Sequence, residues 1–460
     1  MSTPLTINSV ETLQEALPLI RASQEAYSNF TQEQVDAICE KTAMAVSKMR
    51  IPLAKMACEE TGYGIVVDKV TKNQYASEHI WNYMRNKKTC GIISEDRAFG
   101  VKKIASPKGV IAAITPTTNP TSTTIYKIML ALKTRNAIIL SPHPHAVNCS
   151  IAAAKIMRDA AIEAGLPEHV ISWISVPSLE ISDVLMKSVD LIIATGGSGM
   201  VKAAYSSGTP AYGVGPGNPP VVLDRGYDLE DAAKKTVVAV GSDNGILCDG
   251  DNLLLYPQES EEAFFEALKQ EGVVLFEEKK DVEEFGKVLF VNGKANPEMV
   301  GKDAPVIAEA AGFSIPKDTK VVGLKIDAVG RANILNKEIM GPIVVLKSYE
   351  TFEEATAMAV QNMEEAGGIG HTAGIFSNDK KHIDYYAERI PVARVLVNQP
   401  TPDAWGPSTN GLSPAVSESC GTWGNNILCE NVDYIHLINV SKIALPLDVE
   451  LPSGEELFAD

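Results

Sequence analysis

Residues 109–140 read GVIAAITPTTNPTSTTIYKIMLALKTRNAIIL, and this stretch decides the fold class. Its first six residues form a short apolar run that predicts a buried strand, and residues 137–140 predict a second strand. Between them, residues 121–132 have the length and apolar content of a helix. A strand, a helix and a strand in this order predict a right-handed βαβ unit, in which the two strands are parallel.

The same alternation continues along the chain. Further helices are predicted over 149–164, 179–187 and 199–206, and further strands over 170–176 and 191–195. A stretch rich in glycine and proline at 212–220 interrupts the pattern. A second series then runs from a strand at 221–224 to one at 394–398. The first 90 residues have helical spacing of apolar side chains and predict a helical layer. These features predict an α/β protein built on parallel sheets.

Length, charge and cysteine usage limit the class of protein. The chain has 460 residues, a net charge of -17 and a pI near 5.0. This length predicts two large domains, and the negative charge argues against nucleic acid or an anionic membrane as a partner. Seven cysteines without C-x-x-C spacing favour free thiols in the cytoplasm over disulfides or a metal site. The sequence has neither a membrane-span pattern nor a secretion signal.

Two predicted strands end in residues that suit a cofactor site. Ser141 and His143 follow the strand at 137–140, and Thr195, Gly196 and Gly197 follow the strand at 191–194 and precede a helix. Ligands of parallel sheets bind at the carboxyl ends of strands, and glycines at a helix N-terminus let a phosphate approach free N–H groups. The spacing is not G-x-G-x-x-G, so a simple tight turn explains this segment equally well.

A candidate nucleophile lies in the turn GSDNGILCDGDN at residues 241–252. The turn separates a helix-like run at 234–240 from a buried strand at 253–257. Cys248 within it is predicted to be a catalytic thiol, because loops on rigid scaffolds leave backbone N–H groups free to bind developing negative charge. The alternative is that Cys248 is a small buried apolar residue, as most free cysteines are.

Several motifs resemble those of one enzyme family. They occur in the family's order, at 116–122 (PTTNPTS), 141–144 (SPHP), 195–207 (TGGSGMVKAAYSS), 213–220 (GVGPGNPP), 243–248 (DNGILC), 370–372 (GHT), 421–426 (GTWGNN) and 430–431 (EN). Together they resemble the CoA-acylating aldehyde dehydrogenases, above all the aldehyde half of bifunctional aldehyde-alcohol dehydrogenases and the acylating succinate-semialdehyde dehydrogenases. The resemblance covers about residues 30–445. No alcohol dehydrogenase half is expected after Asp460.

The resemblance implies an aldehyde dehydrogenase-like fold, with two Rossmann-like parallel-sheet domains and a β-hairpin oligomerisation arm. The implied domains are a dinucleotide-binding domain at 1–225, a catalytic thiol domain at 226–415, and a C-terminal return segment with an oligomerisation strand at 416–460. Residues 97–106 contribute to the arm. A homodimer or higher oligomer is expected, since exposed edge strands seek partners.

The family mechanism gives roles to three of these residues. The thiolate of Cys248 attacks the aldehyde, and the oxyanion is held by the Cys248 N–H and the side-chain amide of Asn119. Hydride passes to NAD, with NADP not excluded, and coenzyme A then takes the acyl group from the thioester. His371 matches a histidine near the thiol that assists proton transfer. A histidine entering an apolar strand is equally expected to be a satisfied core residue.

The resemblance also implies two further cofactor contacts. Glu338 matches the glutamate that holds the nicotinamide ribose, and Gly215 lies in the matching 213–220 motif. A surface charge at the start of a strand is the alternative for Glu338.

The substrate is the least determined feature of the sequence. Asp249-Gly250-Asp251-Asn252 replaces the family's Ala/Ser-Ser-Glu-Gln after the nucleophile, and residues 399–407 replace a glycine-rich loop. Two aspartates beside the thiol would raise its pKa and repel an anionic aldehyde. An acetaldehyde-like substrate of two to four carbons is therefore favoured over succinate semialdehyde or sulfoacetaldehyde, although the polar loop 400–410 suits an anion.

Three other functions are weighed against the acylating one. A hydrolytic aldehyde dehydrogenase needs a glutamate as base where this chain has Val214-Gly215-Pro216-Gly217. An acyl-phosphate reductase needs basic residues that are not apparent. A non-catalytic scaffold would not be expected to keep Cys248, Asn119 and Glu338 together.

Overall fold

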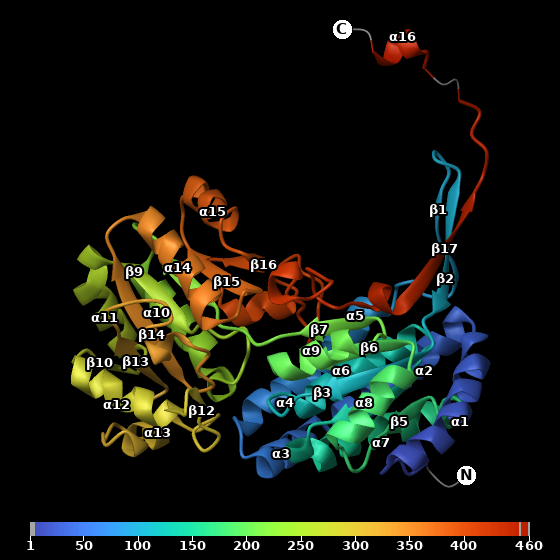
Figure 1. The fold of residues 1–460 in the computed structure, drawn as a ribbon, viewed down its shortest axis with the longest axis horizontal. Coiled ribbons are helices and arrows are strands. Elements are labelled where there is room, and N and C mark those ends of the chain that lie inside the picture. The colour runs from blue at the N-terminus through green and yellow to red at the C-terminus, as the bar shows by residue number, and fades with distance from the viewer. Residues whose placement is uncertain (1–4, 450–451, 459–460) are drawn as a thin grey trace.

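Residues 109–140 form two neighbouring strands of the first parallel sheet and the helix between them. A computed structural model of the chain describes residues 5–449 and 452–458, and Figure 1 shows its fold. The sheet has five parallel strands in the order β5-β4-β3-β6-β7. The strands are β3 (Val110–Thr115), β4 (Ala137–Pro142), β5 (Ile171–Trp173), β6 (Leu191–Thr195) and β7 (Ala211–Val214). The chain reverses direction across the sheet between β3 and β6, which is where such sheets bind ligands.

Helices cover both faces of this sheet. Those between its strands are α6 (Pro120–Lys133), α7 (Val147–Glu163), α8 (Leu179–Ser188) and α9 (Ser198–Ser206). The N-terminal layer consists of α1 (Val10–Ser28), α2 (Gln32–Lys48), α3 (Arg50–Thr61), α4 (Val66–Gln74), a π-helical turn (Tyr75–His79) and α5 (Ile80–Met84). Capping boxes start α1 at Ser9 and α2 at Thr31, where each hydroxyl accepts a bond from a free helix N–H. Helix α6 is buried throughout, because α2 and α7 pack against it.

The second sheet has seven parallel strands in the order β10-β13-β14-β9-β8-β15-β16. They are β8 (Pro220–Leu223), β9 (Leu253–Pro257), β10 (Val273–Phe276), β13 (Val321–Lys325), β14 (Ile343–Tyr349), β15 (Gly370–Phe376) and β16 (Val392–Val397). Its helices are α10 (Leu229–Gly241), α11 (Glu261–Gln270), α12 (Lys279–Leu289), α13 (Ala304–Ala310), α14 (Phe352–Ala366) and α15 (Lys380–Ala387). A small pair, β11 (Phe290–Val291) and β12 (Lys294–Ala295), lies beyond α12.

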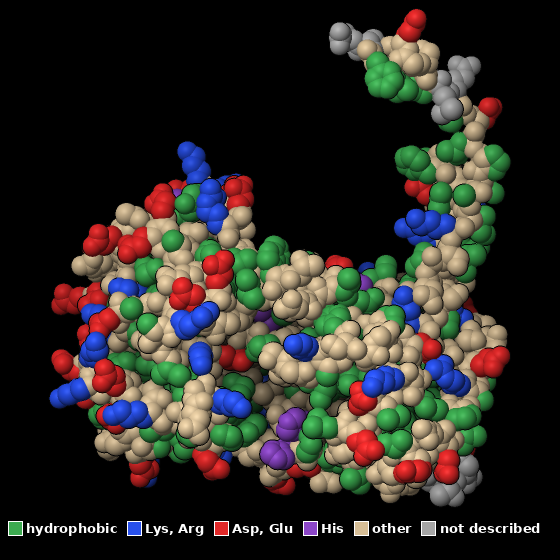
Figure 2. Space-filling view, viewed as in Figure 1, with side chains coloured by type: hydrophobic (Ala, Val, Ile, Leu, Met, Phe, Trp, Pro, Cys, Tyr) green, Lys and Arg blue, Asp and Glu red, His purple; other side chains and the backbone are tan. Residues whose placement is uncertain are grey.

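A third, antiparallel sheet projects from the body as an arm, which Figure 1 shows. It consists of β1 (Gly91–Asp96), β2 (Val101–Pro107) and β17 (Ile438–Ala444). The short helix α16 (Gly454–Leu457) lies beyond it. Apolar side chains cover much of the arm in Figure 2, and Ile92, Phe99, Val440 and Ile443 are exposed. The role of this arm in oligomerisation stays a prediction.

The α/β class and the two parallel sheets that were predicted are confirmed. The interruption predicted at 212–220 is partly wrong, since residues 211–214 form β7 at the sheet edge. Strand β8 pairs with β9 and β15 in the second sheet, although it precedes residue 225. The domain boundaries at 225 and 415 stay predictions. All seven cysteines are described and free, and no helix among the described residues is long and apolar enough to span a membrane.

Candidate active site

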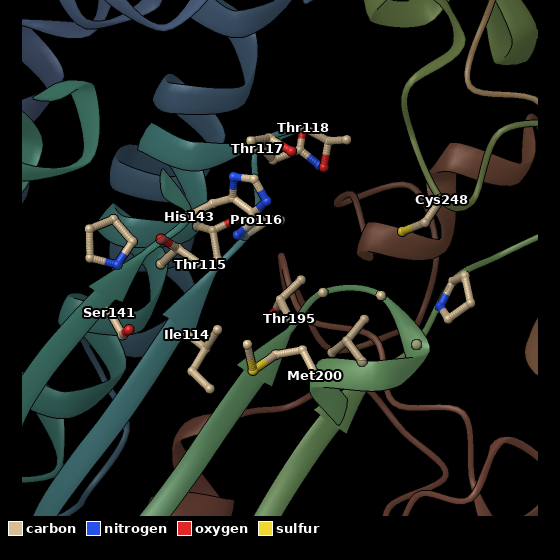
Figure 3. Close-up of a pocket in the computed structure, with 18 of the residues that line it drawn as sticks. Ile114, Thr115, Pro116, Thr117, Thr118, Ser141, His143, Thr195, Met200 and Cys248 are labelled. Atoms are coloured by element: carbon tan, nitrogen blue, oxygen red, sulfur yellow. The ribbon is translucent and has the colours of Figure 1, made fainter. Parts of the chain in front are cut away.

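A cavity of about 490 Å³ opens at the carboxyl ends of β3, β4 and β6, where the second sheet's domain meets the first. Nine of the ten predicted site residues line it: Asn119, Ser141, His143, Thr195, Gly196, Gly197, Gly215, Cys248 and Glu338. Figure 3 shows the Cys248 sulfur pointing toward the space that Thr195, Pro116 and His143 border from the other side. The predicted cofactor end and the predicted thiol end therefore share one cavity.

The cofactor end is built largely from backbone. Thr195 ends β6, and Gly196 and Gly197 lead into α9, so that free N–H groups of the helix start face the cavity. A Cβ added at Gly197 or Gly199 would meet no atom within 4 Å. This edge leaves room for a ligand phosphate to approach the backbone.

A buried lysine holds the two central strand ends together. Lys127 of α6 donates from Nζ to the carbonyl oxygens of Ile114 at 2.6 Å and Ile193 at 3.1 Å, and to Thr195 Oγ1 at 2.9 Å. Burial lowers the pKa of Lys127 well below its usual value. The hydroxyl of Thr195 is thereby fixed by the protein at the point where β3 and β6 diverge.

Ser141 and His143 border the same end of the cavity. Ser141 is buried, with its Oγ 3.4 Å from Ser182 Oγ. Burial lowers the pKa of His143, and His145 lowers it further, so its imidazole is neutral at pH 7. Among the described residues lining the cavity there is no lysine and no arginine. The cofactor end thus offers hydrogen-bond donors without a formal positive charge.

At the other end, the nucleophile loop is fixed by a close backbone approach. A 3-10 turn precedes it, in which Asp243 and Asn244 adopt left-handed conformations at φ 49° and 56°. A Cβ added at Gly217 would lie 1.5 Å from the Cys248 carbonyl oxygen, so only glycine fits there. Burial raises the pKa of the Cys248 thiol well above its usual value, and the Asp249, Glu418 and Glu338 charges raise it further. The resting thiol is therefore protonated.

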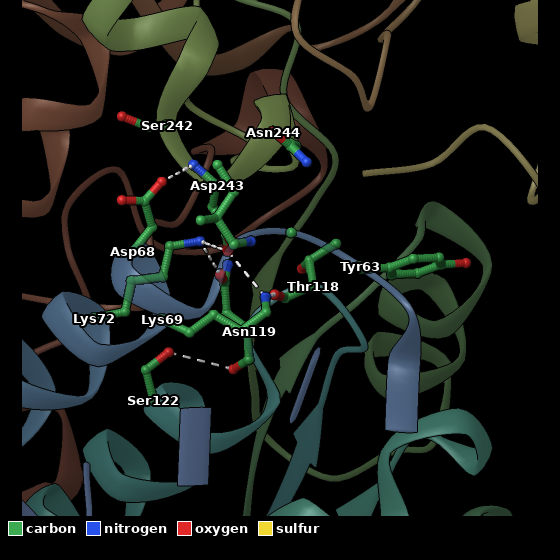
Figure 4. Close-up of polar contacts among 12 residues, drawn as sticks. Tyr63, Asp68, Lys69, Lys72, Thr118, Asn119, Ser122, Ser242, Asp243 and Asn244 are labelled. Carbon is green, nitrogen blue, oxygen red and sulfur yellow. Dashed lines mark hydrogen bonds and ion pairs between the residues drawn. The ribbon is translucent and has the colours of Figure 1, made fainter. Parts of the chain in front are cut away.

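Two buried lysines bind Asp243 of this loop, and one of them, Lys72, also binds Asn119, as Figure 4 shows. Lys72 of α4 donates to Asn119 Oδ1 at 2.7 Å and also to Asp243 Oδ2, and Lys69 donates to Asp243 Oδ2 at 2.9 Å. The side chain of Asp243 is 0% exposed, and those of Lys69 and Lys72 are 3% and 7% exposed. Because the ammonium takes the amide oxygen, the amide NH₂ of Asn119 is left to face other groups.

Asp243 also accepts a hydrogen bond from the Ile65 N–H at 2.6 Å. Burial alone would raise the pKa of Asp243, but the Lys72 and Lys69 charges hold it below its usual value. Asp243 is therefore a carboxylate at neutral pH, and it links α4 of the first domain to the nucleophile loop of the second.

Glu338 lines the cavity near Cys248, and its charge raises the pKa of that thiol. Burial raises the pKa of Glu338 to about 7. Its carboxyl group can therefore accept or donate a hydrogen bond near neutral pH.

His371 is the one predicted site residue that does not line the cavity. It is fully buried on β15, with Nδ1 2.9 Å from Thr372 Oγ1 and Nε2 3.7 Å from Glu418 Oε2. Burial lowers the pKa of His371 to about 3, and Arg394 contributes, so the ring is neutral. Ligand atoms of Cys248, His371 and Glu418 lie within 4.8 Å of one another, a set that could hold a metal ion. The absence of a metal remains a prediction.

Sequence reasoning missed Lys72, Asp243 and Glu418. Lys69 and Lys72 lie three residues apart on one helix face, a spacing that is typical of a charged face exposed to solvent. Asp243 lies in a matched motif, but nothing local marks it as the partner of a lysine 171 residues away. Glu418 lies in an irregular segment with no periodic signal.

The aldehyde dehydrogenase family matches the chain at residues 6–276 and 326–411. The acetylating succinate-semialdehyde dehydrogenase of Clostridium kluyveri is 41% identical, over 97% of this chain and 98% of its own length. The bifunctional aldehyde-alcohol dehydrogenase AdhE of Escherichia coli is 41% identical over 96% of this chain, which covers 50% of AdhE. A solved acetylating aldehyde dehydrogenase of Geobacillus thermoglucosidasius superposes with a TM-score of 0.93 at 38% identity, covering 96% of this chain and 98% of that one.

The chain therefore belongs to the aldehyde dehydrogenase family. Its similarity to acetylating members and to the bifunctional enzyme confirms the predicted resemblance, and the superposition confirms the predicted fold.

Proposed function

We propose that the protein oxidises a short-chain aldehyde with NAD and transfers the acyl group to coenzyme A, through a thioester on Cys248. The observation that carries this proposal is a single cavity with the Cys248 thiol and the Asn119 amide at one end and the glycine edge of α9 at the other. The similarity to acetylating enzymes supports coenzyme A as the acyl acceptor.

In this mechanism Cys248 attacks the aldehyde carbon, and the negative charge moves to the former carbonyl oxygen. The Cys248 N–H and the Asn119 amide NH₂ stabilise that oxygen. Lys72 orients the amide, since it donates to Oδ1 at 2.7 Å and so keeps the amide oxygen away from the oxyanion. An amide turned the other way would present an acceptor to a negative charge.

The residues at the cofactor end fit a bound dinucleotide. Gly196 and Gly197 would hold the pyrophosphate at the start of α9, and Glu338 would hold the nicotinamide ribose. A bound nicotinamide would supply the acceptor for the hydride of the aldehyde carbon. NAD is favoured over NADP, because no lysine or arginine lines the described cavity to pair with a 2′-phosphate.

The cavity favours an uncharged aldehyde such as acetaldehyde. Ile246, Met340, Trp405 and Val416 line it together with Cys248, and no basic side chain lines it to pair with an acidic tail. Asp249 and Asp251 contribute little to this preference, because both are buried and neither lines the cavity. Succinate semialdehyde and sulfoacetaldehyde remain the alternatives, and comparing kcat/KM for the three aldehydes ranks them.

NADH formation with and without coenzyme A tests the proposal. We expect a burst of about one NADH per subunit without coenzyme A and steady turnover with it. Steady turnover without coenzyme A would show a hydrolytic enzyme, and activity only with an acyl phosphate in reverse would show a reductase of that class. No NADH under any condition would show a non-catalytic protein.

We also infer that the protein is a homo-oligomer in which the arm of β1, β2 and β17 pairs with another subunit. The arm projects from the body and exposes apolar side chains such as Phe99 at 70%. Such an edge favours association. Light scattering at micromolar concentration that gives the mass of one 49.4 kDa chain would contradict this. The cytoplasmic location stays a prediction.

A further inference from the structure

Two buried carboxyl groups lie beside the thiol, on segments far apart in the sequence. Asp249 follows the nucleophile directly, and Glu418 comes from the segment after the polar loop and lines the cavity. The residues are 0% and 2% exposed. None of their four carboxyl oxygens makes a hydrogen bond of ordinary geometry to another described residue. Unpartnered buried carboxyl oxygens are costly, so their placement beside a reacting sulfur calls for a function.

Glu418 faces the reacting group itself. One of its oxygens lies within 4.8 Å of the Cys248 sulfur and of a His371 ring nitrogen. That separation suits a proton transfer through the imidazole or one water molecule. Arg394 of β16 lies on the other side, with Nη1 3.7 Å from Glu418 Oε2 and Nη2 donating to the Ser419 carbonyl. Arg394 faces both carboxyls with its positive charge and Lys72 faces Asp249, whereas burial opposes the ionisation of both acids.

The pKa values of the groups around Cys248 fit a proton acceptor at Glu418. Burial raises the pKa of Glu418 well above its usual value, and the charge of Asp249 raises it further. Burial also raises the pKa of Asp249, to about 7. His371 has its pKa lowered to about 3, so it cannot hold the thiol proton by itself. The charged or titratable groups facing the two carboxyls are Cys248, His371, Arg394, Lys72, Asp403 and Tyr75, together with Asp251, which interacts with Asp249 only.

We propose that the carboxylate form of Glu418 accepts the proton of the Cys248 thiol when the thiol attacks the aldehyde, and that the charge of the buried Asp249 tunes this acceptor. This inference rests on the proposed function. In the first half-reaction the Cys248 S–H bond breaks, its proton goes to the Glu418 carboxylate, and the S–C bond forms. The carbonyl then re-forms as the hydrogen of the former aldehyde carbon departs as hydride, which a bound dinucleotide would accept. The product on the enzyme is the Cys248 thioester.

The second half-reaction balances without another base. The coenzyme A thiol loses its proton as its sulfur attacks the thioester, the C–S bond to Cys248 breaks, and the released Cys248 sulfur takes up that proton. The proton that Glu418 accepted from the thiol passes to solvent, which accounts for the one proton released per aldehyde oxidised.

Asp251 provides a matched control two residues from Asp249. It is also buried, and burial raises its pKa to about 7 as well. However, Asp251 accepts a hydrogen bond from Thr401 Oγ1, and it neither lines the cavity nor belongs to the set around the thiol. Replacing Asp251 therefore shows the effect of losing a buried carboxylate, and replacing Glu418 shows the added effect of losing the proton acceptor.

The test is the rate of the NADH burst from about pH 5 to about pH 9, measured by stopped flow with acetaldehyde and NAD and without coenzyme A. In the wild type the burst rate rises with pH and levels off once Glu418 has lost its own proton, because only its carboxylate form can accept the thiol proton. In Glu418→Gln the rate at pH 7 falls about a hundredfold and keeps rising to the top of the range. In Asp249→Asn the plateau is reached at lower pH, because a charge that raises the pKa of Glu418 is gone.

Asp251→Asn keeps the wild-type profile. If Glu418→Gln proves unstable, Glu418→Ala with added formate replaces it, and a saturable gain in burst rate supports the proposal. A wild-type profile in Glu418→Gln, or no gain with formate in a folded Glu418→Ala, would overturn it. The same downward shift in Asp251→Asn as in Asp249→Asn would also overturn it. If the wild-type protein gives no burst, the proposed function itself has failed, which is a distinct outcome.

Discussion

The two ends of the cavity are built in different ways. The cofactor end presents backbone and glycine at the ends of β4 and β6, and its side chains Ser141, Thr195 and His143 carry no formal charge. The thiol end packs ionisable groups from α4, the nucleophile loop, β15, β16 and the segment around Glu418. The cofactor end therefore depends on the backbone shape of the fold. The thiol end depends on buried charges, which are stable only when other charged groups compensate them.

This difference predicts where substitutions act. Changes at the cofactor end should alter how tightly the dinucleotide binds and leave the chemical step almost unchanged. Changes at the thiol end should alter kcat, because the groups there act on charge that develops in the transition state.

Cys248→Ala should have the largest effect, a loss of at least about a thousandfold in NADH formation, because no other group can form the thioester. The loop should keep its fold, since alanine is smaller than cysteine. The exposed Cys429 is the control, and Cys429→Ala should keep wild-type activity. More than a few per cent of activity in Cys248→Ala would mean that another residue is the nucleophile.

Two glycine substitutions compare the ends directly. Gly217→Ala should lower kcat about a hundredfold, because the new Cβ would collide with the Cys248 carbonyl and displace the loop. Gly197→Ala meets no protein atom, so it should only raise KM for NAD by a few-fold. Steady-state kinetics of both variants distinguish the two effects. Equal losses of kcat in Gly217→Ala and Gly197→Ala would show that the two ends of the cavity do not differ in this way.

Lys72→Met should lower kcat by about tenfold to a hundredfold, because the amide of Asn119 would no longer be held with its NH₂ toward the oxyanion. KM for NAD should change little. Lys69→Met is the matched control, since Lys69 also binds Asp243 but does not contact Asn119. Its loss should be clearly smaller. If both variants lose the same activity, the lysines only hold the loop, and the orientation of Asn119 is not what matters.

His143→Ala should have the smallest effect, a rise of a few-fold in KM for NAD with an unchanged kcat, because the side chain is exposed and neutral. Initial rates at several NAD concentrations measure both constants. A fall in kcat of tenfold or more would assign His143 a part in the chemical step.

The sequence predicted the positions of the residues at the cofactor end better than those at the thiol end, for a physical reason. Thr195, Gly196 and Gly197 follow a strand and open a helix, so local periodicity alone places them at a strand end. The position of Cys248 was also predictable from its loop. Lys72 and Glu418 were not, because their importance comes from contacts with residues distant in the chain, and neither has a local signal. The short edge strand β7 was missed because its four residues adjoin a glycine- and proline-rich turn.

The acyl-enzyme itself gives the most direct test of the account. Incubating the protein with acetyl-CoA in the absence of NADH, followed by rapid acid quench and peptide mass spectrometry, reports where the acyl group resides. We predict the added mass of one acetyl group on the peptide that contains Cys248, and its loss when free coenzyme A is supplied before the quench. An acetyl group on another cysteine, or no adduct on a protein that is otherwise active, would contradict the central claim that Cys248 carries the acyl group between the aldehyde and coenzyme A.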